Sequence, residues 1–353
     1  MLTFNSTVNV GNFQFKGVNE INITSSLYDL CDKATIKLPG LEEQIGKDIQ
    51  IGDRVEIYLG YNGEENLEFS GYVDQVSPDI PLTVTCEDEM WWLKRVPITK
   101  DIADLINKAS CKVEVLANTE GENSNLLSSF LKPIQSLNVI PGVNLFIPDL
   151  DIGNFRAEVG SLAKLLQKIK DTYSLAIYFR QKNLYVGFPY TLETFETPII
   201  YDLQRNVVSS DITDKTLDEI KLRLDLVSLP NTGKEEPKIV SKGDPSDVLV
   251  TVHVSNVKNP TSLDLLATEM LAKLKYNRYF SSITTFGIPF IQHSQKVKII
   301  DDNYKERRGT TGRREETYFV SDVQTNVSKN GGFRRQVTLD RKVNPLNGLA
   351  INF

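Results

Sequence analysis

The sequence is poor in the residues that most often build chemical sites. Its 353 residues include three cysteines, two histidines and two tryptophans. Cys31, Cys86 and Cys111 are an odd number without CxxC spacing, which argues against a disulfide framework and for folding in a reducing compartment. His253 and His293 each lack a second ligand residue at a zinc-binding spacing. We therefore predict no metal site.

Other signatures are missing as well. No run approaches the roughly 18 apolar residues that span a bilayer, and residues 1–17 lack the basic start and apolar centre of a signal peptide. There is no GxSxG nucleophile turn, no Walker A sequence and no GxGxxG that opens a helix after a strand. The sequence thus predicts no membrane segment, no cofactor and no enzymatic activity.

The chain is mildly acidic, and its charged residues are unevenly distributed along the sequence. A net charge of −6 does not favour general nucleic-acid binding. Residues 1–100 carry 8 basic and 16 acidic side chains, whereas residues 201–353 carry 23 and 19. An acidic first third and a basic last third can meet head to tail in an oligomer; alternatively, both are simply solvated surfaces.

Alternating apolar and polar residues dominate both ends of the chain. Residues 1–90 and the stretches after residue 200 repeat with period two, which is typical of half-buried antiparallel strands. Between them, residues 160–173 have the apolar spacing of an amphipathic helix, and residues 175–187 that of a hairpin. A second helix is predicted over residues 261–277. The expected fold class is mainly β with an α+β insertion.

Two parts of the chain share one order of strands. Residues 52–57, 69–77 and 81–88 are echoed by residues 294–299, 318–328 and 334–341. The matched apolar positions are Val55 and Ile57 with Val297 and Ile299, Val73 and Val76 with Val320 and Val323, and Val84 and Cys86 with Val337 and Leu339. The echo indicates either an internal duplication or chance, because alternating strands resemble one another easily. Duplication predicts two related antiparallel β-barrel domains.

The patterns predict a division of the chain into three domains and a tail. These are a first barrel in residues 1–95, an α+β middle domain in 96–200, a second barrel in 201–345 that contains the helix 261–277, and a C-terminal tail in 346–353. At the first boundary lies the sequence CEDEMWW, residues 86–92. We interpret it as the end of the last strand of the first barrel, with Cys86 as a small buried apolar residue, followed by a short helix.

A basic segment at residues 301–316 is the strongest candidate for a contact site. It contains Arg307, Arg308, Arg313 and Arg314, with glycines between them. Contact with phosphate or with an acidic partner is one interpretation, and a solvated hairpin loop is another. Because no aromatic residues are interleaved, we favour a subunit contact or an oligomer rim over specific DNA binding.

Two rival functions use other residues. A carbohydrate-binding or adhesion module needs an exposed aromatic platform, for which Tyr58, Tyr61 and Tyr72 are candidates. A cell-wall hydrolase needs two carboxyl groups facing each other, one of them with a raised pKa. The acidic runs at residues 64–65, 87–89 and 301–302 lie in predicted turns, where we expect solvated acids.

The order of these segments resembles a known family. Gly52-Asp53 before a strand, then Phe69, Gly71 and Val73 in the next strand, and then residues 86–88 before a helix are similar to the first domain of bacteriophage tail baseplate hub proteins. That family includes the late control protein D type and the N-terminal hub half of type VI secretion spike proteins. The stretches 161–187 and 318–342 resemble their middle domain and last strands.

The resemblance implies a structural role. Hub proteins carry two tail-tube-like barrels separated by an insertion, and three subunits form a ring of pseudo-sixfold symmetry around a DNA channel. Such a ring adapts a hexameric tail tube to a trimeric spike, so the implied partners are the chain itself, the tube protein and the spike protein. The implied location is the virion tail or baseplate, assembled in the bacterial cytoplasm. No lysozyme or needle domain follows the second barrel, so we expect the spike to be a separate chain.

Overall fold

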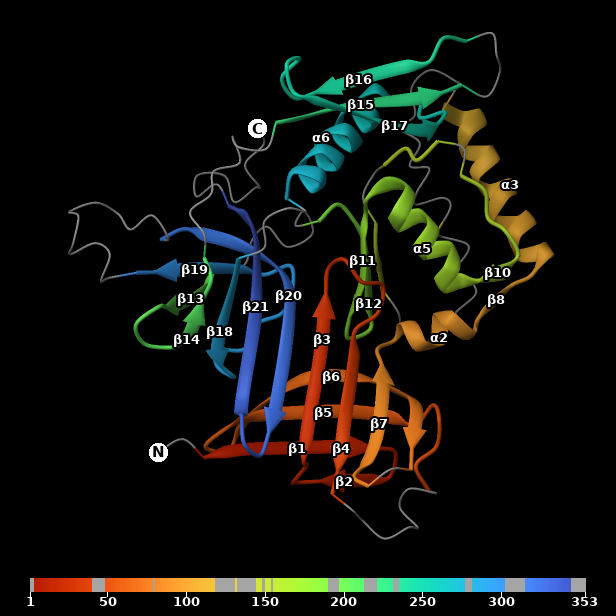
Figure 1. Cartoon of the computed structure of the whole chain (residues 1–353). Helices are drawn as coiled ribbons and strands as arrows, with labels where there is room; N and C mark the ends of the chain where they lie inside the picture. Colours follow the sequence, from red (N-terminus) through yellow and green to blue (C-terminus); the bar gives the residue numbers. More distant parts are fainter. Residues whose placement is uncertain are drawn as a thin grey trace.

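The computed structural model describes residues 3–39, 48–78, 80–117, 131, 144–147, 150–153, 155–189, 197–212, 221–230, 235–276, 281–301 and 315–343. Within these residues the chain is mainly β. One sheet of thirteen strands runs through both ends of the sequence, and three smaller sheets accompany it. Figure 1 shows a lower β unit, a second β unit beside and above it, and an α+β body on the remaining side.

The first barrel is formed by the N-terminal strands, which pair in the order β3-β4-β7-β6-β5-β1-β2. All neighbours are antiparallel, and every second side chain points into one apolar core, as the alternation predicts. The strands are β1 (Phe4–Val10), β2 (Phe13–Phe15), β3 (Glu20–Ser26), β4 (Lys33–Leu38), β5 (Arg54–Tyr61), β6 (Glu64–Ser77) and β7 (Leu82–Glu87).

The second barrel is formed by strands from the last part of the chain, in the order β14-β18-β21-β20-β19, with β13 beside β19. Its core is a separate apolar cluster that includes Val297, Val320 and Val337. The strands are β13 (Ile199–Asp202), β14 (Val207–Ser210), β18 (Ser281–Phe286), β19 (Lys296–Ile300), β20 (Thr317–Ser328) and β21 (Gly332–Lys342).

The two barrels repeat one strand order. The series β3-β4-β7-β6-β5 corresponds to β14-β18-β21-β20-β19, with every pair antiparallel. Beyond this series the halves differ: β1, which pairs with β2 as well, is antiparallel to β5, whereas β13 is parallel to β19.

The register repeats as well as the order. Val73 lies opposite Cys86 in the first barrel, and Val320 opposite Leu339 in the second, which are the positions matched from the sequence. In both hairpins the register shifts directly after this pair, between Val73 and Gln75 and between Val320 and Asp322. A β-bulge at the same place is a specific feature that chance alternation does not supply. The echo in the sequence is therefore a structural repeat.

The α+β body packs its helices on two small sheets around one apolar core. Local contacts fix both ends of the helix α5. The Ser161 hydroxyl caps its start by accepting a hydrogen bond from the Lys164 N–H, and Ser174 ends it in the left-handed conformation with φ 54°. The elements are α2 (Met90–Arg95), β8 (Pro97–Ile98), α3 (Lys100–Ala117), β9 (Asn144–Phe146), β10 (Gly160–Ser161), α5 (Leu162–Tyr173), β11 (Ala176–Arg180) and β12 (Asn183–Gly187).

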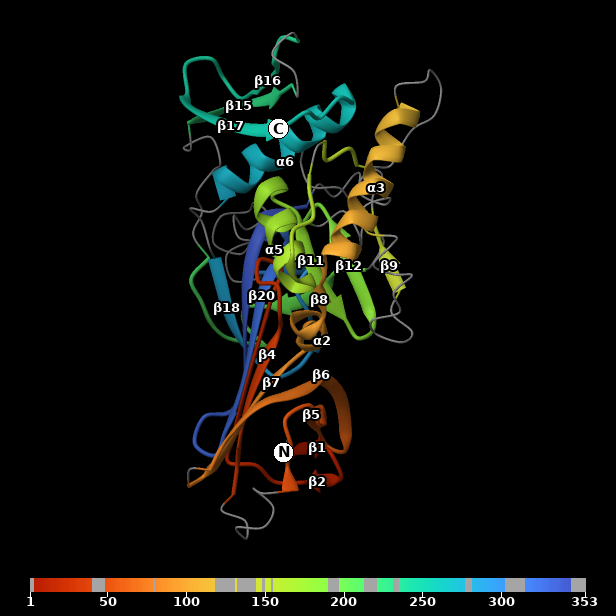
Figure 2. The same cartoon turned by 90° about the vertical axis from the view of Figure 1, so that its right-hand side faces the viewer.

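Residues 221–276 extend this body. They form the sheet β16-β15-β17 and the helix α6, whose core side chains join the same cluster as α5 and β11. Figures 1 and 2 show this unit at the end of the molecule opposite the first barrel. Apolar and polar residues alternate in β15 as they do in a barrel strand. The sequence alone therefore places residues 221–276 in the second barrel. The bounds are β15 (Leu222–Leu229), β16 (Lys238–Lys242), β17 (Val248–Ser255) and α6 (Pro260–Tyr276).

The sequence CEDEMWW marks the end of a structural unit, as predicted. β7 ends at Glu87 with Cys86 buried, and α2 begins at Met90. Met90 and Leu93 of α2 pack in the core of the α+β body. The segment therefore carries the chain from the first barrel into that body.

The first barrel takes part of its core from the second. The hairpin of β20 and β21 extends beyond its own barrel, so that Val327 and Phe333 are buried in the core of the first one. The Phe333 ring lies against Tyr61 and Phe4, with 5.6 Å between ring centroids in both pairs. Figure 1 shows this blue hairpin reaching down to the red and orange strands.

Truncation of Phe333 tests whether the stability of the first barrel depends on the hairpin of the second. We expect Phe333→Ala to lower the free energy of unfolding by about 3–5 kcal/mol, because it leaves a cavity in the first barrel. Phe286→Ala is the matched control, since this ring lies on β18 and is partly exposed. Chemical denaturation followed by tryptophan fluorescence measures both. An equal, small loss in the two variants would contradict the shared core.

Candidate functional site: the joint between the two barrels

The predicted contact residues lie outside the described part of the chain. Arg307, Arg308, Arg313 and Arg314 belong to residues 302–314, between β19 and β20. Their role at a subunit contact or rim stays a prediction.

Two of the three tyrosines proposed for a carbohydrate platform stack on other aromatic rings of the chain. The Tyr61 ring stacks on Phe333, and the Tyr72 ring stacks on Trp91 with 5.6 Å between centroids. The Tyr58 hydroxyl donates to Glu56 over 3.0 Å. Tyr61 and Tyr72 are therefore engaged in packing within the chain.

The acidic run after β7 is buried, contrary to the expectation of solvated acids. Glu87 pairs with Lys94 and Glu89 with Arg54, each over 2.6 Å. Asp88 accepts from the backbone N–H groups of Asp32 and Met90, over 3.0 and 2.9 Å. Each acid is thus held by a partner that fixes the turn between β7 and α2, and sequence could not distinguish this buried turn from a solvated one.

The cysteines that the sequence places in the first barrel and its loops carry no reactive thiol. Burial raises the pKa of both Cys31 and Cys86, since charge is disfavoured away from water. Both thiols are therefore protonated at neutral pH and are poor nucleophiles.

What the structure does assemble is a joint between the two barrels. β20 pairs with β3 over seven residues, from Asp322 opposite Ser26 to Ser328 opposite Glu20. The Ser26 hydroxyl donates to Asp322 over 2.5 Å, and the Tyr28 hydroxyl donates to Asp340 over 2.5 Å. Backbone and side chains together merge the two barrels into one sheet.

A buried ion pair crosses the same joint. The Arg335 guanidinium on β21, which is 0% exposed, donates to the Glu68 carboxylate on β6 over 2.5 Å. It also donates to the Pro289 carbonyl over 2.7 Å. Burial raises the pKa of Glu68, and the neighbouring Arg335 opposes that shift. Such a pair is costly to break because either partner alone is an unpaired buried charge.

The sequence contains a signal for this pair, although the signal belongs to no known motif. Phe333, Arg335 and Val337 lie on the same face of an alternating strand, so an arginine occupies an apolar position. A charge in such a position needs a partner, but sequence does not say which of the acids supplies it.

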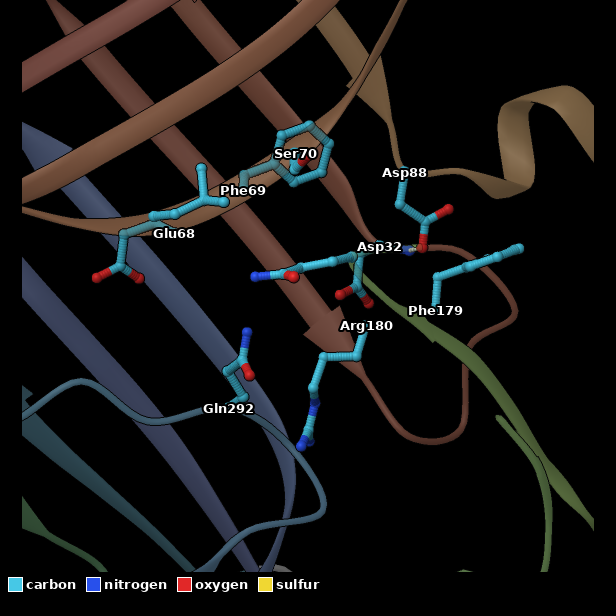
Figure 3. Close-up of a pocket in the computed structure, with 10 residues that line it drawn as sticks. Asp32, Glu68, Phe69, Ser70, Asp88, Phe179, Arg180 and Gln292 are labelled. Carbon is cyan, nitrogen blue, oxygen red and sulfur yellow. Dashed lines mark hydrogen bonds between the residues drawn. The ribbon is translucent and has the colours of Figure 1, made fainter. Parts of the chain in front are cut away.

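A small cavity lies where the first barrel, the second barrel and β11 meet. Its volume is about 60 Å³, and it is lined by Glu68 and Ser70 from β6, by Asp32 and Asp88, and by Arg180 and Gln292. Figure 3 shows the two aspartates joined by a hydrogen bond, with Arg180 and Gln292 across from Glu68. This volume holds a few water molecules and is well below the roughly 300–1,000 Å³ of small-molecule sites.

The two aspartates beside the cavity both have a raised pKa. Burial raises the pKa of Asp88 to about 6, and burial and the nearby Asp88 charge raise the pKa of Asp32 well above its usual range. The Ser25 hydroxyl donates to Asp32 over 2.5 Å. Their oxygens accept hydrogen bonds from the chain itself, so they position the loop after β3 rather than face a substrate.

His293 borders the same region as a neutral side chain. Burial and, to a smaller extent, the nearby Arg180 charge lower its pKa to about 3. Its ring packs edge-on against Tyr178 at 4.6 Å, and its carbonyl accepts from Arg180 over 2.8 Å. His293 is thus a packing residue between the second barrel and β11.

No group of three or more His, Cys, Asp or Glu side chains that could hold a metal ion occurs among the described residues. Within those ranges no helix is long and apolar enough to cross a membrane.

Comparison with known proteins places the fold. No protein-family model and no curated protein sequence matches the chain. Among solved structures, a tail protein from Neisseria meningitidis MC58 is 16% identical, with a TM-score of 0.62 over 96% of each chain. The 43 kDa tail protein of prophage MuSo2 from Shewanella oneidensis is 14% identical, with a TM-score of 0.55 over 95% of this chain and 97% of that one.

A third similar structure comes from a secretion system. The E. coli c3393 protein, a component of the type VI secretion system with structural similarity to the T4 tail proteins gp27 and gp5, is 8% identical, with a TM-score of 0.50 over 98% of this chain and 79% of that one. At these identities the likeness establishes the fold alone. The chain has the fold of phage tail proteins of the baseplate hub type, which confirms the resemblance seen in the sequence.

Removal of one partner of the buried ion pair tests the joint. We expect Glu68→Leu to lower the free energy of unfolding by about 3–5 kcal/mol, because Arg335 is left buried and unpaired. The double variant with Arg335→Leu should lose less than the sum of the two single variants. Lys37→Met, which breaks an exposed pair with Glu20, should cost at most about 1 kcal/mol. Additive losses at Glu68 and Arg335 in denaturant titrations would show that they do not interact.

The aspartate pair predicts a pH dependence of stability. Because the folded pKa of Asp88 is about 6, the folded protein binds more protons than the unfolded chain between about pH 4 and pH 6, and its stability falls as the pH rises through that window. For Asp88 alone the loss is about 3 kcal/mol. Asp32→Asn can keep its bonds to Ser25 and Ser26 without the second charge, so its stability should fall less.

Thermal unfolding from pH 4 to pH 8 measures this difference. Asp104→Asn is the control, because Asp104 is exposed on α3, and it should follow the wild-type profile. The same decline in wild type and Asp32→Asn would exclude the pair as its source.

Proposed function

We propose that the chain is a structural hub of a phage or prophage tail, or of a related contractile injection machine. In this role three copies form a ring around a DNA channel, and the ring adapts a six-fold tail tube to a three-fold spike. The role is fulfilled by interfaces and requires no catalysis. Its partners are further copies of the chain, the tail tube protein and the spike protein, and its location is the virion tail or baseplate.

One observation carries the proposal: a single chain contains two barrels with the same strand order, the same pairing register and the same bulge position. A closed ring of three such chains presents six similar edges, which is what a contact with a six-fold tube needs. The fold shared with tail proteins from two bacterial genomes supports the same role.

The charge is compatible with a channel for DNA. A lumen that only conducts DNA should not hold phosphates tightly, and the chain has a net charge of −6. The aspartates and glutamates at the barrel joint are engaged with partners in the chain, so the proposal assigns them to architecture.

Native mass spectrometry of the purified chain tests the ring. We expect a species with three times the 39.8 kDa mass of one chain, either alone or after a spike protein of the same tail is added. Co-purification with the tail tube protein should yield six tube subunits per three hub chains. A chain that stays monomeric with both partners present would contradict the proposal.

A further inference from the structure

A row of stacked aromatic rings crosses the small sheet of β9, β12 and β11. Tyr178 lies opposite Tyr185, and Tyr185 lies opposite Phe146, so the three side chains share one face of the sheet. The ring centroids of Tyr178 and Tyr185 are 5.2 Å apart, and those of Tyr185 and Phe146 are 4.7 Å apart. The opposite face of the sheet contributes to the core of the α+β body.

The row becomes more exposed toward the edge of the sheet. Tyr178 is 3% exposed and packs against His293, whereas Phe146 is 43% exposed. Among the described strands β9 pairs with β12 alone, and Figure 2 shows β9 at the outer side of this sheet. One face of the Phe146 ring is stacked on Tyr185 at 12° from parallel. The other face is therefore directed away from the remaining strands of the sheet.

The stack holds this exposed ring in one orientation. A single exposed phenylalanine is ordinary, and an exposed side chain usually samples several rotamers. Here the nearly parallel contact with Tyr185 restricts Phe146, and the buried Tyr178 restricts Tyr185 in turn. A ligand that stacks on Phe146 does not have to order the ring first, which lowers the entropic cost of binding.

Polar groups lie beside the open face of the ring. Asn144 precedes Phe146 by two residues on the same face of β9, and its side-chain amide donates to the Asn183 side chain over 3.0 Å. Each amide has further donor and acceptor positions. The Asn144 backbone N–H donates to the Lys182 carbonyl. Because the groups of a parallel strand alternate in direction, the backbone N–H and C=O of Leu145 are directed to the open edge.

We propose that this edge, formed by Asn144, Phe146 and Asn183, binds a sugar ring of a polysaccharide. The C–H face of the sugar stacks on Phe146, and its hydroxyl groups bond to the two amides and to the backbone edge of β9. A pyranose ring has an apolar C–H face and a rim of hydroxyl groups that donate and accept hydrogen bonds, which is the complement of these groups. The site lies outside both barrels, so this activity is additional to the proposed hub function.

A sugar fits these groups better than a single-stranded nucleic acid. A phosphate backbone needs cationic side chains along its path. The row beside the aromatic rings consists of Asn144, Asn183 and Arg180, and Arg180 already donates to the His293 carbonyl over 2.8 Å. Two amides next to a flat ring are suited to neutral hydroxyl groups, which they can bind as donors and as acceptors.

Binding to immobilised oligosaccharides provides the first test. The probes are oligomers of glucose, galactose, rhamnose and N-acetylglucosamine, which differ in the hydroxyl pattern around the ring. We expect the full chain to bind at least one of them, Phe146→Ala to weaken that binding about tenfold, and Phe146→Trp to retain it. Phe286→Ala is the matched control, because Phe286 is 37% exposed on β18, and it should bind as the wild type does.

Saturation-transfer NMR with the best-bound oligosaccharide provides the second test. Irradiation of the aromatic protons of the protein should transfer saturation mainly to the ring C–H protons of the sugar. This transfer should disappear in Phe146→Ala, while an unchanged melting temperature shows that the variant folds. Asn144→Ala should weaken binding severalfold and keep the transfer, because the stacking ring is still present.

The outcomes separate the ligand classes and leave the hub proposal independent. A wild type that binds none of the oligosaccharides, or a Phe146→Ala variant that binds them equally well, would overturn the sugar site. Binding of a labelled oligothymidine that is lost in Phe146→Ala, and that falls steeply between about 50 and 200 mM salt, would assign the edge to nucleic acid instead. None of these results bears on whether three copies form a ring.

Discussion

The architecture depends on the pairing of β3 with β20. These strands are about 300 residues apart in sequence, yet seven backbone pairs hold them side by side and make one sheet of the two barrels. The buried pair of Arg335 and Glu68 and the insertion of Phe333 both lie at this seam. The first barrel is not complete without it, since its core includes Val327 and Phe333 from the hairpin of the second. The seam therefore holds the two equivalent units together as one sheet.

Buried polar groups give this seam its specificity. An apolar contact tolerates small shifts, whereas Arg335 must reach both Glu68 and the Pro289 carbonyl. The aspartates near the cavity fix the loop after β3 in the same way. Their raised pKa values show that the arrangement holds carboxyl groups where water would otherwise favour their charge.

Much of the fold could be predicted from local patterns in the sequence, whereas the contacts between elements could not. Alternation at Val55 and Ile57 predicts a strand, and the matched valines and leucines of the two halves occupy equivalent pairs in the structure. The same alternation in β15 favours a barrel strand, although β15 packs under α6 in the α+β body. Burial of residues 87–89 could not be inferred, because a turn has no periodicity that separates a covered acid from a solvated one. Arg335 carries a signal in its position, but its partner is set by tertiary structure.

The two hairpins differ in length, and in the proposed ring this difference would decide how many copies of a partner bind. Thirteen residues separate the pair Val323 and Val337 in one hairpin, against seven between Val76 and Val84 in the other. In a ring of three chains, long and short tips would alternate around the circumference. Three chains have six barrels, so a protein that binds the strands common to both barrels would bind in six copies. A protein that contacts only the longer hairpins would bind in three copies. In the proposed ring, a change of stoichiometry would thus come from the six additional residues of the longer hairpin, which extend its paired strands.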